Sequence, residues 1–177
     1  YISLNGEIHA ARDAVKSHTW RPDTFQSPDR GPAAVVGPNG FESHRELGSR
    51  SVTLSIDDRP TGNVPVVPIG LGVDRDVIDR AVDAGCDGVV VEATGLGNAP
   101  EPVAEGIADA IDTGVPVVIT SRCYAGGVAA VYGGGGGHTL KEHGAVFAGD
   151  LPAAKARIKL LCALESELSV AEAFAEN

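Results

Sequence analysis

The sequence predicts an α/β protein whose carboxyl-terminal part folds around a four-stranded parallel sheet. From about residue 63 onward, short apolar runs rich in β-branched residues alternate with segments that have the apolar spacing of helices. Near the start, Asn5-Gly6 follows a strand-like run that begins at Tyr1, and this dipeptide is a strong signal of a hairpin turn. A hairpin piece is therefore expected ahead of the parallel α/β part.

Four apolar runs are the candidate strands of the parallel sheet. The first, 64–69, contains two prolines, which restrict it to the first or edge positions of a sheet because proline cannot donate to a hydrogen-bond ladder. The run 88–91 is continuously apolar, as is typical of a strand covered on both faces. The runs 115–120 and 145–148 follow. Since helices lie between the runs, the connections are crossovers and the strands are expected to be parallel.

Three helices are expected between and after these strands. Asp74 is the expected N-cap of the first helix, which Gly85 ends. The second helix is expected over 100–113, where apolar residues recur at i, i+4 and i+8. Asp150 is the expected N-cap of the third helix, over 151–165.

The chain is expected to contain two domains of unequal completeness. Residues 1–40 are too few to bury a core of their own, so we interpret them as the carboxyl-terminal part of a larger domain. Residues 41–62 break the α/β pattern and are interpreted as a linker, with one short strand at 51–56. Residues 63–177 form the small α/β domain. Because the chain begins with Tyr1 in a strand-like run, we infer an amino-terminal truncation.

Composition excludes several classes of protein. Of the 177 residues, 43% are hydrophobic and 21% charged, which is typical of a globular chain. No run reaches the roughly 18 apolar residues of a membrane helix, and no signal peptide begins the chain, so we expect a cytoplasmic protein without membrane contact. The net charge of −10 disfavours nucleic-acid binding. Low lysine and abundant aspartate suit a high-salt cytoplasm.

Cysteine and histidine spacing predicts neither a disulfide framework nor a metal site. The three cysteines are far apart and are expected to be reduced thiols: Cys86, Cys123 and Cys162. The histidine pairs considered as ligands lack nearby carboxylate or cysteine partners: His138 with His143, and His9 with His18. We expect no metal and no cofactor.

Glycine-rich segments follow two of the predicted strands, at the edge where open parallel sheets bind ligands. The first contains Gly95-Leu96-Gly97-Asn98, and the second extends from Ser121 to Gly127. Tight turns in a crossover are the alternative interpretation. The first is no dinucleotide fingerprint, because Pro100 stands where its last glycine belongs, and Gly133 to Gly137 lacks the Gly-Lys-Ser/Thr of a phosphate loop. We interpret this last run as a mobile loop.

Lys16 is the lysine with the most informative surroundings. It lies at the end of a strand-like stretch, after Ala14-Val15 and before Ser17-His18-Thr19. A solvated surface lysine is the simpler interpretation. Burial, however, lowers the pKa of an amine, and a neutral amine can act as a base.

Several ordered blocks of the sequence resemble the carboxyl-terminal half of bacterial and archaeal-type L-asparaginases. The blocks of the larger domain are Asn5 to Arg12, Lys16 to Thr19 and Thr24 to Pro32. Those of the smaller, flavodoxin-like domain are Val91 to Pro100, Ser121 to Cys123, Gly149 to Leu151 and Lys155 to Arg157. The resemblance extends from residue 1 to about residue 164.

The resemblance implies hydrolysis of asparagine to aspartate and ammonia through a threonine nucleophile and an acyl-enzyme. Lys16 matches the lysine of the family's threonine, aspartate and lysine triad, so it is the predicted catalytic residue. The nucleophile, the other triad members and the oxyanion donors precede Tyr1, so the isolated chain is expected to be inactive. Active sites at the interface of an intimate dimer, usually paired into a tetramer, are also implied.

Two departures from the family pattern concern the smaller domain. Where some members place an asparagine that reaches a neighbouring subunit's site, this chain has Leu96. Gly95, Gly97 and Asn98 are therefore the predicted substrate-adjacent residues, in trans. The run from Gly133 to Gly137 stands where other members carry an acidic residue, so no site residue is assigned there.

Two other functions compete with an asparaginase. The first is the asparaginase-like subunit of an archaeal tRNA-dependent amidotransferase, which shares the motifs and frees ammonia for a partner enzyme; nucleic acid would then be a partner of the complex. The second is a non-catalytic α/β module that binds a ligand or partner at its strand ends. The sequence does not decide between asparagine and glutamine.

Overall fold

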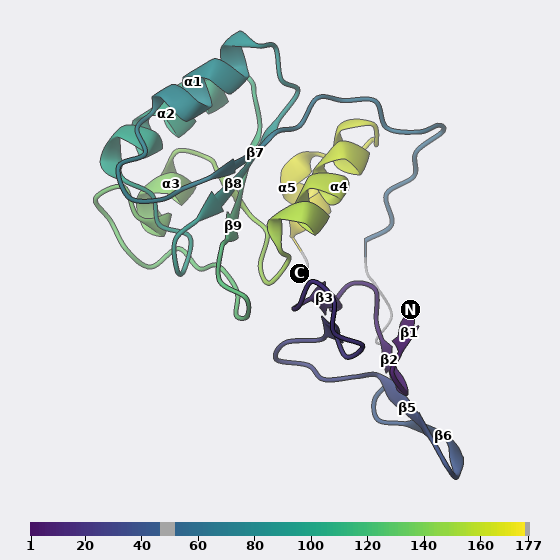
Figure 1. Cartoon of the computed structure of the whole chain (residues 1–177). Helices are drawn as coiled ribbons and strands as arrows, with labels where there is room; N and C mark the ends of the chain where they lie inside the picture. The colour runs from purple at the N-terminus through teal and green to yellow at the C-terminus, as the bar shows by residue number, and fades with distance from the viewer. Residues whose placement is uncertain (47–51, 176–177) are drawn as a thin grey trace. The chain divides into compact units, whose positions relative to one another are not determined.

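The computed structural model describes residues 1–46 and 52–175, which belong to two compact units, Tyr1–Ser51 and Val52–Asn177 (Figure 1). The first unit is built around an antiparallel sheet with the strand order β1-β2-β5-β6. Its strands are β1 (Ile2–Leu4), β2 (Glu7–His9), β5 (Ala34–Gly37) and β6 (Gly40–Ser43). A separate pair, β3 (Val15–Lys16) and β4 (Phe25–Gln26), is also antiparallel.

The predicted hairpin at the start of the chain is confirmed. Asn5 and Gly6 connect β1 to β2 with φ angles of 53° and 78°. Two successive positive φ angles are the signature of a type I′ turn, which matches the twist of the flanking strands. The Asn-Gly dipeptide therefore selects this turn locally.

The segment predicted as a linker begins inside the first sheet. Phe41 and Ser43 belong to β6 and pair with Val36 and Ala34 of β5. The short strand predicted at 51–56 is wrong for the described part, 52–56, which has no strand, and Ser51 lies outside the described residues. Leu54 instead packs against the core of the second unit, so its apolar character reflects packing rather than pairing.

The second unit contains the predicted parallel sheet of four strands, in the order β10-β9-β8-β7. Its strands are β7 (Val66–Pro68), β8 (Val89–Ala93), β9 (Val117–Ser121) and β10 (Val146–Phe147). The two prolines in and beside β7 correctly predict its place at an edge. The apolar runs of β8 and β9 lie in the middle of the sheet, where almost every residue is buried.

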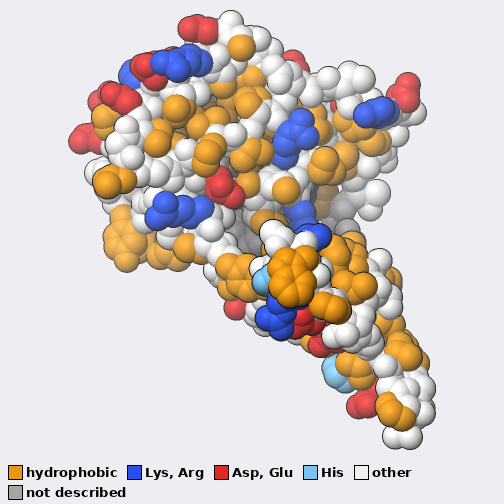
Figure 2. All heavy atoms as spheres, in the orientation of Figure 1, with side chains coloured by type: hydrophobic (Ala, Val, Ile, Leu, Met, Phe, Trp, Pro, Cys, Tyr) orange, Lys and Arg blue, Asp and Glu red, His pale blue; other side chains and the backbone are white. Residues whose placement is uncertain are grey.

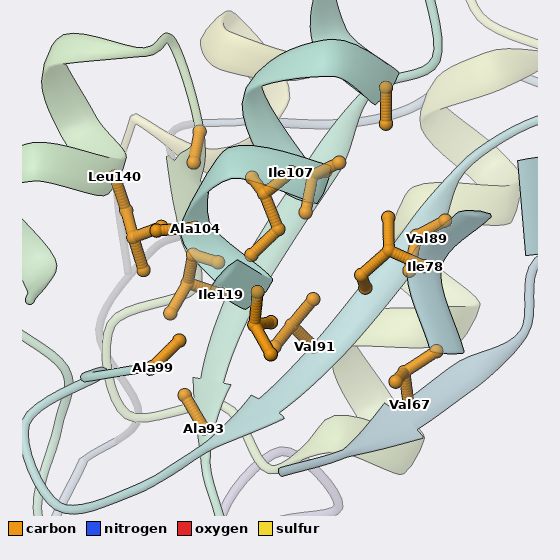
Figure 3. Close-up of a cluster of buried hydrophobic side chains, with 14 of the residues drawn as sticks. Val67, Ile78, Val89, Val91, Ala93, Ala99, Ala104, Ile107, Ile119 and Leu140 are labelled. Carbon is orange, nitrogen blue, oxygen red and sulfur yellow. The ribbon is translucent and has the colours of Figure 1, made fainter. Parts of the chain in front are cut away.

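Helices cover both faces of this sheet (Figure 1). One face carries α1 (Asp76–Asp83), α2 (Glu101–Asp112) and α3 (Gly137–Glu142), and the other carries α4 (Ala153–Leu164) and α5 (Val170–Phe174). Alternate strand residues point to opposite faces, so Val91 and Ile119 pack with Ile107 of α2 (Figure 3). Val90 packs instead with the α4 layer. The unit is a three-layer α/β sandwich.

Both aspartates predicted as helix caps lie outside the caps. The N-cap of α1 is Arg75, and the Asp74 carboxylate accepts the N–H of that residue at 2.7 Å. The N-cap of α4 is Pro152, two residues after Asp150. A proline disfavours helical geometry in the residue before it, so α4 cannot include Leu151 as the sequence pattern suggested.

An arginine joins α1 and α2, which lie on the same face of the sheet. The Arg75 guanidinium lies 2.8 Å from Asp79 in α1 and 2.6 Å from Asp109 in α2. Figure 2 shows acidic and basic side chains side by side over these helices. The hydrogen bond from Arg75 holds the pKa of Asp79 below its usual range.

Candidate functional site

Lys16 is the second and last residue of β3, where it pairs with Phe25 of β4. Its side chain is exposed in this chain. Lys16 and the three residues after it line an open hollow of about 300 Å³. The first unit therefore presents the predicted catalytic lysine among the residues that line this open hollow.

The loop after Lys16 is closed by Thr24, which precedes β4. The Thr24 carbonyl accepts the N–H of Ser17 at 2.7 Å and the Ser17 hydroxyl at 3.0 Å. The Thr24 hydroxyl accepts the N–H of His18 at 3.2 Å and donates to the His18 carbonyl. Thr24 is only 6% exposed, and these side-chain bonds are partly buried. No signal in the sequence singles out Thr24 for this role.

The turn that leads into β3 is held by an ion pair between distant parts of the first unit. Asp13, whose side chain is 6% exposed, lies 2.5 Å from Nη2 of Arg45. Arg12 and Arg30 approach the same carboxylate at 3.4 and 3.9 Å. The N–H of Asp13 also donates to the Ala10 carbonyl at 2.9 Å, which closes the turn. This ion pair could not be predicted, because the partners are 32 residues apart.

The loop after β8 is a compact turn that contains the predicted substrate-adjacent residues. The N–H and hydroxyl of Thr94 both donate to the Asn98 carbonyl, at 3.0 and 2.9 Å. The Ser121 hydroxyl, at the end of β9, donates to the Gly95 carbonyl at 2.6 Å. The Asn98 side-chain oxygen accepts the N–H of Gly137 at 3.2 Å, at the start of α3. Asn98 thus joins the loop to α3.

Gly97 lets this loop pack against the sheet. It is buried with a φ of 104°, and a Cβ there would lie 3.1 Å from Ile119 and 3.3 Å from Phe147. Beside it, the Leu96 carbonyl accepts the N–H of Ala129 at 2.8 Å, so the loop after β9 is tied to the same structure. The structure brings Gly95, Gly97 and Asn98 together with the end of β9.

The glycine run from Gly133 to Gly137 is packed over its last three residues, so its interpretation as a mobile loop is wrong for Gly135 to Gly137. Gly135, Gly136 and Gly137 are buried, and α3 begins at Gly137. A Cβ on Gly136 would lie 2.5 Å from the Tyr132 carbonyl oxygen. These glycines therefore allow close backbone approach, a role that composition alone does not distinguish from flexibility.

Lys16 belongs to the first unit, whereas the glycine loop belongs to the second. Among the described residues, no three histidine, cysteine, aspartate or glutamate side chains gather as a metal site would require. In the same residues, no helix is both long and apolar enough to cross a bilayer. All three cysteines are free.

The fold defines a class of protein with two parts. An antiparallel unit that contains a lysine-bearing hairpin is followed along the chain by a three-layer parallel α/β unit. Residues 63–174 match the family model described as the Glutaminase/Asparaginase C-terminal domain. Residues 1–47 match the one described as Asparaginase, N-terminal. The chain therefore belongs to the asparaginase/glutaminase family, as its sequence blocks predicted.

Similar curated proteins are archaeal. The chain is 38% identical over 129 residues to a subunit of the glutamyl-tRNA(Gln) amidotransferase of Methanothermobacter thermautotrophicus, covering 71% of this chain and 29% of that protein. It is 30% identical over 173 residues to the corresponding amidotransferase subunit of Methanosphaera stadtmanae, covering 95% of this chain and 39% of that protein. The chain thus spans about a third of these relatives.

A solved structure with a similar fold is bacterial. It is described as a probable cytoplasmic L-asparaginase from Campylobacter jejuni and superposes with a TM-score of 0.81 at 25% identity. The match covers 99% of this chain and 55% of that one. The predicted α/β asparaginase fold is therefore confirmed over nearly all of the chain.

Proposed function

We propose that the protein containing this chain hydrolyses the side-chain amide of L-asparagine, releasing aspartate and ammonia. The observation that carries the proposal is the position of Lys16, which ends β3 and lines the hollow, within the segment that matches the N-terminal asparaginase model. Family membership supports an amidohydrolase in general. The choice of asparagine is our inference.

In this proposal Lys16 handles a proton. A threonine hydroxyl becomes a nucleophile when a nearby base accepts its proton, and the neutral amine of a lysine can do so. The amine is neutral near pH 7 only if its surroundings disfavour the charge. We propose that residues outside these 177 bury the amine and provide the nucleophilic threonine, with the aspartate of the triad.

We also propose that the glycine loop acts in an oligomer, with Gly95, Gly97 and Asn98 near the substrate of a neighbouring subunit. The loops after β7, β8 and β9 expose large apolar or aromatic side chains, which supports an interface at this edge: Leu71, Leu96, Tyr124, Val131 and Tyr132. The hydrogen bond from Gly137 to Asn98 favours a supporting role for the Asn98 side chain. Light scattering of the full-length protein tests for a dimer or tetramer.

The test of the proposed activity uses the full-length protein, with ammonia release from L-asparagine and from L-glutamine as the measurement. Lys16→Met is expected to lower kcat by at least about 100-fold, the lower range for loss of a general base. Lys141→Ala, a change at an exposed lysine of α3, is the matched control and is expected to leave turnover unchanged. Full turnover by Lys16→Met contradicts the assignment.

A second candidate is the ammonia-producing component of a tRNA-dependent amidotransferase. The names of the archaeal relatives, at 30 to 38% identity, favour it. This candidate predicts that asparagine hydrolysis is weak alone and rises when a partner protein and charged tRNA are added. Fast hydrolysis without them supports the first proposal. Absence of turnover under both conditions, with retained ligand binding, supports a non-catalytic module.

A further inference from the structure

We propose that Thr24 is the positioning residue of Lys16, a role that rests on the proposed function. Thr24 contacts neither substrate nor reacting atoms in this proposal. Its role is to fix the backbone from which the lysine side chain extends, so that the amine reaches the proton it accepts.

The ladder that pairs the backbone of Lys16 with β4 is short and ends at Lys16. Strands β3 and β4 are two residues long each, and Lys16 with Phe25 is the last pair of their ladder. An isolated two-stranded hairpin is marginally stable in water. The ladder by itself is therefore a weak support for a catalytic side chain.

Thr24 adds hydrogen bonds beyond the end of the β3–β4 ladder. Its carbonyl takes two hydrogen bonds from Ser17, through the N–H at 2.7 Å and the hydroxyl at 3.0 Å. Its hydroxyl then bonds both the N–H and the carbonyl of His18, in place of a backbone partner. Both residues that directly follow Lys16 are thus bonded to one threonine.

Thr24 is buried, whereas most of the residues around Lys16 are exposed. Thr24 is 6% exposed, whereas Lys16, Ser17 and Thr19 are exposed. A buried hydroxyl bonded to backbone groups is costly to remove, because those groups are left without partners. Thr24 is therefore the fixed side of the hairpin, and the exposed residues that line the hollow are held in place against it.

Small shifts of the backbone at Lys16 become larger shifts of its side-chain amine. The lysine nitrogen lies at the end of a four-carbon stem, so a rotation at its Cα displaces the nitrogen more than the backbone. A displacement of about 1 Å in a catalytic group can cost roughly 100-fold in rate.

The test compares three variants of the full-length protein. Thr24→Val keeps the shape and removes the hydroxyl, and Thr24→Ser keeps the hydroxyl. Thr61→Val makes the same change at an exposed threonine of the second unit, away from the hollow's lining residues. We expect Thr24→Val to lower kcat by about 10- to 100-fold, with a smaller change in KM. Thr24→Ser is expected to restore most of kcat, and Thr61→Val to match the wild type.

The pH profile separates positioning from mere stability. A base acts when deprotonated, so kcat rises as pH increases through its pKa. With Thr24→Val the rising limb is expected to differ from that of the wild type, because the limb reports the surroundings of the base and these change when the base is displaced. A variant that is only less stable would keep the pH dependence of kcat that the wild type has. An unchanged limb, with kcat per folded molecule unchanged, overturns the proposal.

Two further outcomes keep the inference separate from the proposed function. If Lys16→Met is inactive while Thr24→Val has normal kcat and pH profile, the positioning role is wrong and the function stands. If Lys16→Met is fully active, the function itself is contradicted. If Thr24→Val fails to fold, Thr24→Ala provides the hydroxyl-free variant. A Thr24→Ser protein whose pH dependence of kcat differs from that of the wild type overturns the inference.

Discussion

Nδ1 of His9 lies 2.9 Å from the hydroxyl oxygen of Ser27, and this hydrogen bond ties β2 to the segment after β4. His9 is 2% exposed and Ser27 is 7% exposed. On the other side of the ring, Nε2 lies 3.3 Å from a Glu7 carboxylate oxygen. A buried ring nitrogen needs such a partner, and the Nδ1 bond links the antiparallel sheet to the chain that carries the lysine hairpin. Among the described residues, Nε2 is buried and makes no hydrogen bond.

The first prediction concerns Ser27→Ala. The change leaves Nδ1 of His9 buried without its partner, which costs about 1–3 kcal/mol. Urea unfolding followed by circular dichroism measures the loss. Ser3→Ala, at an exposed position of β1, is the control and is expected to change stability by less than about 0.5 kcal/mol. Equal effects of the two changes would show that the hydrogen bond contributes little.

The second prediction compares two glycines of the loop after β8. Gly97→Ala forces a Cβ to within 3.1 Å of Ile119, whereas Gly95 has open space around it and a φ of 53°. Both changes strain a positive φ, but overpacking adds roughly 1–3 kcal/mol at Gly97 alone. Thermal unfolding should therefore show a lower Tm for Gly97→Ala than for Gly95→Ala. The reverse order contradicts the packing role of Gly97.

The third prediction concerns pH and the bridge between α1 and α2. The Arg75 hydrogen bond lowers the pKa of Asp79 below its ordinary value of 3.8. A lowered folded-state pKa adds stability above the ordinary value, and this is lost as pH falls through the folded pKa. Asp79→Asn is thus expected to reduce the urea midpoint at neutral pH, and the difference from wild type should shrink well below pH 3.8.

Asp83→Asn is the matched control for this bridge, because Asp83 is an exposed carboxylate at the end of the same helix. It is expected to leave the urea midpoint nearly unchanged at both pH values. If the urea midpoint of Asp79→Asn is as far below that of the wild type in acid as at neutral pH, the carboxylate acts through packing rather than through its charge.

The fourth prediction is a difference in thiol reactivity. Burial raises the pKa of Cys86, whereas Cys123 is exposed in the segment after β9. Because the thiolate is the reactive form, a maleimide at neutral pH should label Cys123 first and Cys86 slowest. Mass spectrometry of the labelled chain, with and without denaturant, reads the order. Fast labelling of Cys86 in the folded protein would contradict its burial.

Local signals in the sequence were enough for much of the secondary structure. Asn5-Gly6 requires positive φ angles and so selects its turn without help from the rest of the fold. The prolines of β7 place it at the sheet edge, because they lack N–H donors. The unbroken apolar run of β8 predicts cover on both faces. Each of these depends on backbone chemistry or burial, which neighbours in sequence reveal.

Other features depend on residues that meet only in the folded chain. The glycine run before α3 has the composition of a flexible loop, yet Gly136 stands where the Tyr132 carbonyl leaves no room for a Cβ. Asp74 and Asp150 have the chemistry of caps, but the N-caps of their helices lie one and two residues later. Residue type alone does not predict these outcomes, because it does not show which distant parts of the chain pack against a given position.

The sequence by itself determined the α/β class, the parallel sheet with its edge strand, and the choice of Lys16 and of the glycine loop as residues to examine. Only the tertiary structure decided that Thr24 and Asn98 hold these two segments in place. The physical reason is that periodicity and turn preference act within a few residues. A hydrogen bond such as that from Gly137 to Asn98 joins residues 39 apart, and depends on how the whole sheet and its helices pack.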